Sequence, residues 1–129
     1  EQGIRTLVGK ALGRESYSID PDTFDYVKRE ANLYPELDKA SRELLPGADG
    51  KMTRLRIFNI DANSVFSTYG IEDGDVVEFI DGERVDFEGP ATEHLARWNR
   101  LLEKIDKGGS VGITVLRNGQ PTQIDFKLK

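Results

Sequence analysis

Residues 70–85, GIEDGDVVEFIDGERV, hold a concentration of carboxylates that could serve a metal site or an acid–base pair. The acidic side chains are Glu72, Asp73, Asp75, Glu78, Asp81 and Glu83. A calcium-binding EF-hand loop needs glycine at its sixth position, and counting from Asp73 puts Glu78 there. An aspartic protease needs Asp followed by Thr or Ser and then Gly, which neither DGD nor DGE supplies. We therefore predict a surface turn whose carboxylates are solvated.

Residues 108–112, GGSVG, match the G-x-S-x-G pattern of a nucleophile elbow. That chemistry needs the serine on a turn from a strand into a helix, with an acidic residue and a histidine later in the chain. Here a helix is predicted before Ser110 and a strand after it, and the single histidine, His94, lies upstream. We interpret Ser110 as a loop residue.

The remaining residue types give no catalytic constellation. His94 is the sole histidine and the chain has no cysteine, which excludes zinc sites built from His and Cys. No phosphate-binding loop, dinucleotide fingerprint or H-E-x-x-H motif occurs. We predict that the domain is not an enzyme and has neither cofactor nor metal. We interpret His94 as a solvated helix residue and Trp98 as a core anchor, with peptide recognition as the alternative for His94.

Composition favours one folded domain with some additional chain. The sequence has 129 residues, with 18 Lys and Arg against 23 Asp and Glu, giving a net charge of −5. This balance argues against binding nucleic acid or an anionic membrane surface, both of which need a basic footprint. No apolar run approaches the roughly 20 residues needed to span a bilayer. Because the chain begins at Glu1, we expect it to be a piece of a longer protein. The lack of cysteine fits an oxidising compartment without excluding the cytosol.

The first third of the sequence predicts a linker followed by a strand and a helix. Residues 1–15 contain three glycines and little apolar patterning, so we predict a linker. Residues 16–19 alternate as a short strand does. Asp20 and Pro21 then form a helix start, and the apolar spacing predicts a helix to about Asn32. Residues 35–45 predict a second helical stretch or, alternatively, extended chain after Ala40.

The remaining two thirds predict an α+β fold. The expected elements are a strand at 55–60, a short helix at 62–69, a strand at 76–80, a long helix from Pro90 to about Lys107, and a final hairpin around Asn118-Gly119. Asp61 or Asn63 is expected to cap the short helix, and Gly70 to end it. Asp81-Gly82 is a preferred dipeptide for a tight turn. In such an order, helices cover the open ends of a small antiparallel sheet.

Residues 56–85, RIFNIDANSVFSTYGIEDGDVVEFIDGERV, resemble the core signature of bacterial PDZ domains. The long helix and the turn Arg117-Asn118-Gly119 complete that pattern through Lys129. The resemblance implies a PDZ domain over residues 40–129. This would be a small antiparallel sheet or partly open barrel capped by two helices, with a strand-helix extension at residues 16–39.

The segment before the core is similar to the corresponding part of the inner-membrane protein C of type II secretion systems. Residues 16–60 carry this second resemblance, with a strand, a helix and a Pro…Gly-Lys loop leading into the core. It implies a noncatalytic periplasmic domain of an inner-membrane-anchored protein, in contact with the secretin or with exported proteins. The alternative is a substrate-recognition PDZ module of a periplasmic or membrane-bound protease.

A PDZ fold binds an extended peptide by strand addition in a groove between a strand and the long helix. The resemblance implies that this groove is formed by Met52, Thr53, Arg54, Leu55, Arg56, Ile57, Phe58, His94, Leu95, Trp98 and Leu102. The stretch Met52–Leu55 lacks the glycine that eukaryotic PDZ domains have next to this strand. Recognition of a terminal carboxylate through Arg54, of an internal strand and of a folded partner surface therefore all stay open.

Overall fold

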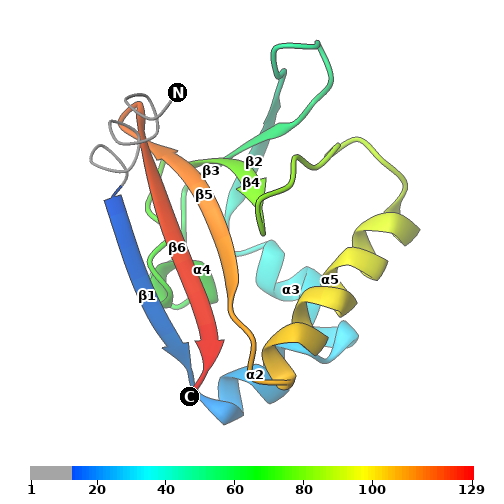
Figure 1. Ribbon diagram of the computed structural model, residues 1–129, viewed down its shortest axis with the longest axis vertical. Helices are drawn as coiled ribbons and strands as arrows, with labels where there is room; N and C mark the ends of the chain where they lie inside the picture. The colour runs from blue at the N-terminus through cyan, green and yellow to red at the C-terminus, as the bar shows by residue number, and fades with distance from the viewer. Residues whose placement is uncertain (1–12) are drawn as a thin grey trace, which may run out of the picture.

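The computed structural model describes residues 13–129, which form a mixed six-stranded sheet with four helices (Figure 1). The strands are β1 (Gly13–Ile19), β2 (Ser41–Leu45), β3 (Arg54–Phe58), β4 (Val76–Ile80), β5 (Val111–Arg117) and β6 (Gln120–Leu128). The helices are α2 (Pro21–Val27), α3 (Glu30–Leu37), α4 (Val65–Thr68) and α5 (Ala91–Asp106). The predicted α+β class is confirmed.

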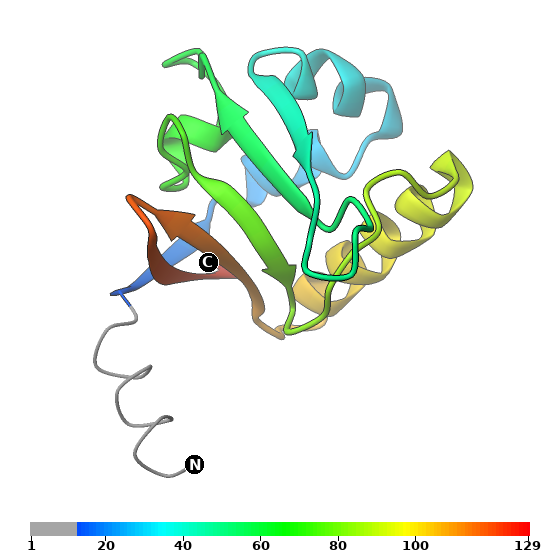
Figure 2. The same ribbon diagram turned by 90° about the horizontal axis from the view of Figure 1, so that it is seen from above.

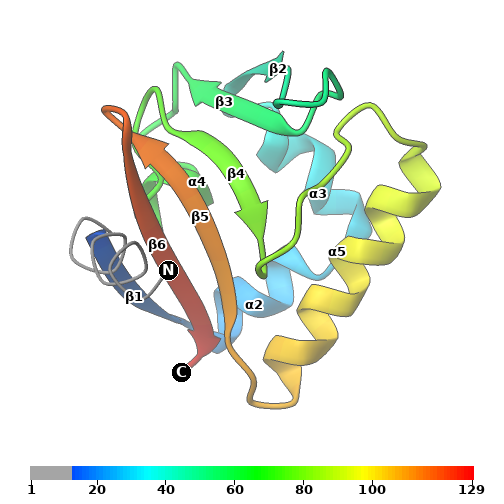
Figure 3. The same cartoon turned by 45° about the horizontal axis from the view of Figure 1, so that its top comes forward.

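The sheet runs in the order β1-β6-β5-β4-β3-β2 (Figure 3). Four neighbouring pairs are antiparallel, but β1 and β6 are parallel, from Gly13 beside Thr122 to Ile19 beside Leu128. The strands within residues 40–129 pair antiparallel, as expected, and the parallel pair comes from β1 in the N-terminal extension. Parallel pairing is available because α2 to β5 separate the two strands in the chain, giving the long crossover that it requires.

β1 begins at Gly13, so it includes the last three residues of the predicted linker. The rest of that linker, residues 1–12, lies outside the described residues. The ring of Tyr17 on β1 stacks on Phe126 of β6, and Tyr69 meets both rings edge-on. β1 is thus packed into the same sheet and core as the C-terminal hairpin.

The predicted single helix from Pro21 to Asn32 is two helices. The helical conformation is interrupted at Lys28 and Arg29. The Asn32 side chain donates a hydrogen bond back to the carbonyl of Tyr26 at 2.9 Å. α3 then continues to Leu37, and three residues separate it from the strand that begins at Ser41. Of the two alternatives for residues 35–45, extended chain after Ala40 is the one observed.

α4 is shorter than predicted and has a different cap. It begins at Val65, and the hydroxyl of Ser64 accepts the backbone N–H of Ser67 at 3.2 Å. Asp61 and Asn63, the expected caps, lie too early in the chain; the Asp61 side chain accepts the N–H of Asn63 instead. Gly70 follows with φ of +87°, as predicted for a residue that ends a helix.

The C-terminal elements follow the prediction closely. β4 spans Val76–Ile80, and Asp81-Gly82 forms a two-residue turn with both φ angles positive. Asn118-Gly119 does the same between β5 and β6. α5 begins after Pro90 and ends at Asp106, with Lys107 as its C-cap. Positive φ at both central residues is the geometry that matches the twist of paired strands.

The core lies between the sheet and the helices that pack against it (Figures 1 and 3). Val115 and Ile124 at its centre are fully buried on adjacent central strands. Phe24 from α2 and Leu102 and Ile105 from α5 close it from the helical side. Among residues 13–129, no helix has the length and apolarity that crossing a membrane requires.

Candidate functional site

A groove with a volume of about 450 Å³ lies between β2, α3 and α5. Its lining is mainly apolar and comes from segments that are distant in the sequence: Leu33, Tyr34 and Leu37 of α3, Leu44 of β2, Leu55 of β3, and Leu95 and Trp98 of α5. Figures 1 and 2 show β2 at one edge of the sheet and α5 beside the sheet. An apolar cleft with a few polar groups is the usual form of a binding site.

The structure brings together only some of the residues expected to form this groove. Those that line it are Leu55, His94, Leu95 and Trp98. Leu102 is 8% exposed and belongs to the core, because α5 turns it towards β5 and β6. The remaining six, residues 52–54 and 56–58, do not line the groove. Thr53 and Ile57 are buried.

The arginines in that segment are engaged with other side chains. Arg54 pairs with Glu78 of the neighbouring strand β4 at 3.2 Å. Arg56 pairs with Glu43 at 3.5 Å and lies over the ring of Phe58, 4.5 Å from its centre. Arg54 is therefore not in position to replace the missing carboxylate loop.

The expected mechanism at residues 55–60 needs a correction, because a strand cannot be added to β3. β3 is hydrogen-bonded to β2 on one edge and to β4 on the other. β2 has β3 on one edge and, within residues 13–129, no strand on the other. An unpaired edge presents a row of N–H and C=O groups that accept another strand. The edge open to strand addition is β2.

Sequence reasoning gave β2 only as an alternative to a helix, because its pattern is weak, and did not place it at the groove. SRELL has charged residues at Arg42 and Glu43 and ends in two leucines, so it fits a helix as well as a strand. Its usable signal was position: Pro46 and the glycine-rich loop 46–51 separate it from β3 as a hairpin loop would. Arg42 and Leu44 face the groove, and this alternation identifies β2 as a strand once the structure is known.

Two polar atoms on the α5 side are buried without a partner. His94 Nε2 and Trp98 Nε1 both have no hydrogen bond within residues 13–129, and both residues line the groove. A buried polar atom without a partner costs about 1–3 kcal/mol. The description of His94 as solvated is therefore wrong for this ring nitrogen.

The groove also holds exposed apolar surface and positive charge. Tyr34 is 55% exposed and Leu44 is 40% exposed, and both line it. Its charged lining residues are Arg42 and Arg97, and no carboxylate of residues 13–129 lines it. The groove is therefore an apolar channel with a positive character on a chain of net charge −5.

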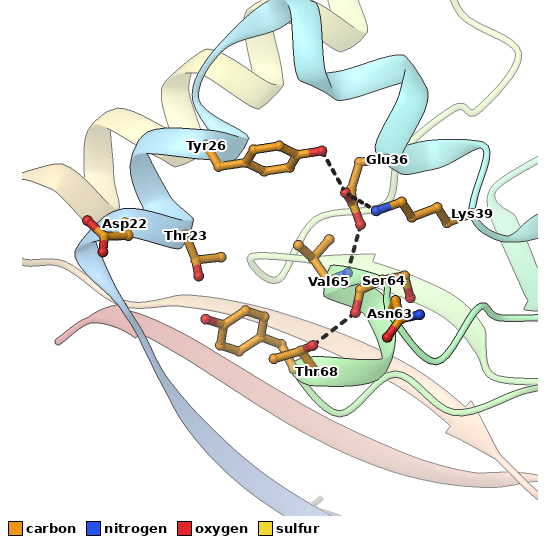
Figure 4. Close-up of a pocket in the computed structure, with 10 residues that line it drawn as sticks. Asp22, Thr23, Tyr26, Glu36, Lys39, Asn63, Ser64, Val65 and Thr68 are labelled. Atoms are coloured by element: carbon orange, nitrogen blue, oxygen red, sulfur yellow. Dashed lines mark hydrogen bonds and ion pairs between the residues drawn. The ribbon is translucent and has the colours of Figure 1, made fainter.

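A second cavity of about 400 Å³ lies between α2, α3 and α4, and several of its polar groups are paired around Glu36 (Figure 4). Glu36, only 6% exposed, accepts hydrogen bonds from Tyr26 Oη at 3.0 Å, Lys39 Nζ at 3.1 Å and the Val65 N–H at 2.8 Å. Burial raises the pKa of Glu36, but these three donors outweigh it and hold the pKa below its usual value. The cluster is a clamp between α3 and α4.

The acidic stretch at residues 70–85 proves to be structural, and one of its carboxylates is not solvated. Asp75 is 1% exposed and accepts two hydrogen bonds from Arg117, at 3.0 and 2.7 Å. Arg117 also donates to the carbonyl of Gly70 and to Glu15 of β1, each at 2.7 Å. No cluster of three potential metal ligands occurs among residues 13–129. The surface-turn interpretation is therefore wrong for Asp75.

The strand order, the short helix before β4 and the long helix beside an open strand edge define a PDZ-like fold, as the sequence predicted. The chain is similar to the solved PDZ domain of EpsC from Vibrio cholerae, with a TM-score of 0.54 and 16% sequence identity over 83% of this chain and 92% of that one. A shorter piece of the same EpsC domain matches with a TM-score of 0.42 and 18% identity, over 69% of this chain and 93% of that one.

No protein-family model matches the sequence, and no curated protein matches it either. The similarity to EpsC therefore concerns the fold.

Proposed function

We propose that this chain is a noncatalytic protein-interaction domain that binds an extended segment of a partner as an additional strand on β2. The observation that carries the proposal is the unpaired edge of β2 beside an apolar groove. Main-chain hydrogen bonds to β2 supply affinity, and the apolar wall of α5 selects side chains. His94 and Trp98 add two polar atoms that have no partner within residues 13–129.

We further propose that the parent protein belongs to a type II secretion system and carries this domain in the periplasm from an inner-membrane anchor. The partner is then a periplasmic domain of the secretin or an exported protein. The resemblance of residues 16–60 to the inner-membrane protein C family supports this, and so does the fold similarity to the PDZ domain of EpsC. The alternative, a PDZ module of a protease, requires a catalytic domain elsewhere in the parent chain, which the full-length sequence would reveal.

Binding of purified secretin periplasmic domains and exported proteins, measured by biolayer interferometry, tests both parts. We expect Leu44→Asp to weaken binding at least tenfold, because it puts a charge into the apolar groove at a position that is already 40% exposed. Ser110→Asp adds the same charge at an exposed site outside the groove and should bind as the wild type does.

A folded Leu44→Asp variant with unchanged affinity would exclude the groove. If neither the secretin domains nor the exported proteins bind the wild-type domain, the assignment to secretion is overturned while strand addition is not.

A further inference from the structure

Resting on the proposed strand addition at β2, we propose that the groove takes an internal extended segment of its partner rather than a free C-terminus. The segment carries a large apolar side chain that enters behind Trp98 and an acidic side chain near Arg42 or Arg97. Three separate features of the structure support this.

The first feature is the chain that precedes β2. A terminal carboxylate is captured by free backbone N–H groups at the end of the strand to which the peptide adds. Residues 38–40 occupy that position, and all their N–H groups donate to α3 carbonyls: Asp38 to Tyr34 at 2.9 Å, Lys39 to Glu36 at 3.1 Å, and Ala40 to Leu37 at 3.3 Å. The extra helix α3 therefore uses the donors that a carboxylate would need.

The other end of β2 is equally short of donors. Pro46, directly after the strand, has no N–H, and Gly47 donates its N–H to the carbonyl of Lys51 at 2.7 Å. A peptide could run along β2 in either direction, and in neither would its terminal carboxylate meet free donors at the adjoining residues. A chain that continues past both ends of the strand carries no terminal charge to satisfy there.

The second feature is an inner cavity that adjoins the groove. An apolar cavity of about 240 Å³ lies between α5, α2 and the sheet. Ile80, Trp98 and Leu101 line both it and the groove, so these three side chains separate the two spaces. A rotation of Trp98 would join the two spaces and admit one large side chain of the bound segment. Filling an apolar cavity with apolar atoms lowers the free energy of the complex.

The third feature is the pattern of polar groups on the groove walls. Trp98 Nε1 is a buried donor without a partner in residues 13–129, and the same rotation of Trp98 would bring it within reach of the carbonyl oxygens of a bound strand. Arg42 on β2 and Arg97 on α5 are the charged lining residues, and no carboxylate faces them from the groove. An acidic side chain in the segment would complement them.

Two peptide-display libraries test the proposal without knowledge of the natural partner. In one, random decapeptides end in a free carboxylate; in the other, the same decapeptides are flanked by linkers on both sides. Selection uses the wild-type domain, with the folded Leu44→Asp variant for counter-selection. We expect the flanked library to be enriched in Phe, Leu or Trp together with Asp or Glu, and the free-ended library to show no preference at its last residue.

An enriched sequence is then synthesised as a free acid, as an amide and with a C-terminal extension. We expect the three dissociation constants to agree within about twofold, and replacement of the large apolar residue by Ala to weaken binding at least tenfold. A free acid that binds at least tenfold more tightly than the amide overturns this inference but leaves strand addition standing. If neither library is enriched, the proposed function itself fails.

Discussion

The carboxylate of Glu36 in α3 accepts the backbone N–H of Val65 at the start of α4, at 2.8 Å and across 29 residues of sequence. This bond fixes α3, which forms one side of the groove, to the short helix before β4. Tyr26 and Lys39 donate to the same carboxylate, so one buried charge joins three helical segments (Figure 4).

We expect Glu36→Ala to lower the free energy of unfolding by about 1–3 kcal/mol, because it leaves the Val65 N–H without its acceptor. Urea unfolding followed by circular dichroism measures the change. Glu103→Ala serves as the control, since Glu103 forms an exposed ion pair with Lys107 on α5 and should give no measurable loss. Equal losses in the two variants would contradict the clamp.

The same carboxylate should make stability depend on pH. The pKa of Glu36 lies below its ordinary value of 4.5 in the folded protein, so the stabilisation is complete above pH 4.5 and is lost as the pH falls below it. We therefore expect the difference in unfolding free energy between the wild type and Glu36→Gln to be constant from pH 6 to pH 8. It should shrink below pH 4.5. A difference that grows in acid would contradict the direction of the shift.

The Arg117–Asp75 pair should be among the most sensitive contacts in the protein. Arg117→Met leaves the carboxylate of Asp75 buried without its charged partner, with the Glu72 N–H still donating to it, which costs about 3–5 kcal/mol. Arg14→Met is the matched control, because Arg14 pairs with Asp125 through a side chain that is 68% exposed. We expect that change to cost less than about 1 kcal/mol in the same urea titration. Similar losses for the two arginines would contradict a structural role for Asp75.

Gly70 and Gly74 share the same backbone conformation, so substituting each by alanine distinguishes backbone strain from steric conflict. Gly70 and Gly74 have φ of +87° and +90°, and a Cβ at Gly74 meets no atom within 4 Å. A Cβ at Gly70 would overlap the ring of Tyr17. We expect Gly74→Ala to cost about 1–2 kcal/mol, from the left-handed backbone alone, and Gly70→Ala to cost about 1–3 kcal/mol more. Thermal unfolding of both variants shows whether the difference exists.

The inner cavity beside Trp98 predicts a stabilising substitution. Val111 lines this cavity, and Val111→Ile adds one methylene to it, which should raise the unfolding free energy by up to about 1 kcal/mol. Val115 is fully buried and does not line the cavity, so Val115→Ile should overpack the core and cost about 1–3 kcal/mol. Destabilisation by Val111→Ile would show that the cavity does not admit a larger side chain.

The sequence by itself determined most of the local structure and the fold. Asp81-Gly82 and Asn118-Gly119 specify tight turns because few residue types accept positive φ there, and Gly70 ends a helix for the same reason. The apolar spacing of α5 likewise specified a long helix. These signals depend on neighbouring residues only, and the predicted turns and helix occur in the structure with nearly the predicted boundaries.

Tertiary structure alone decided which strand is free, which side chains meet and which charges are buried. The sequence made β3 appear suitable for a partner strand, but β2 pairs with its second edge. The segment SRELL does not predict this pairing, because its pattern fits a helix as well as a strand. Glu36 and Val65, like Asp75 and Arg117, are joined by the packing of distant segments. Strand order and burial depend on contacts across the whole chain, so the site became visible only once the chain was folded.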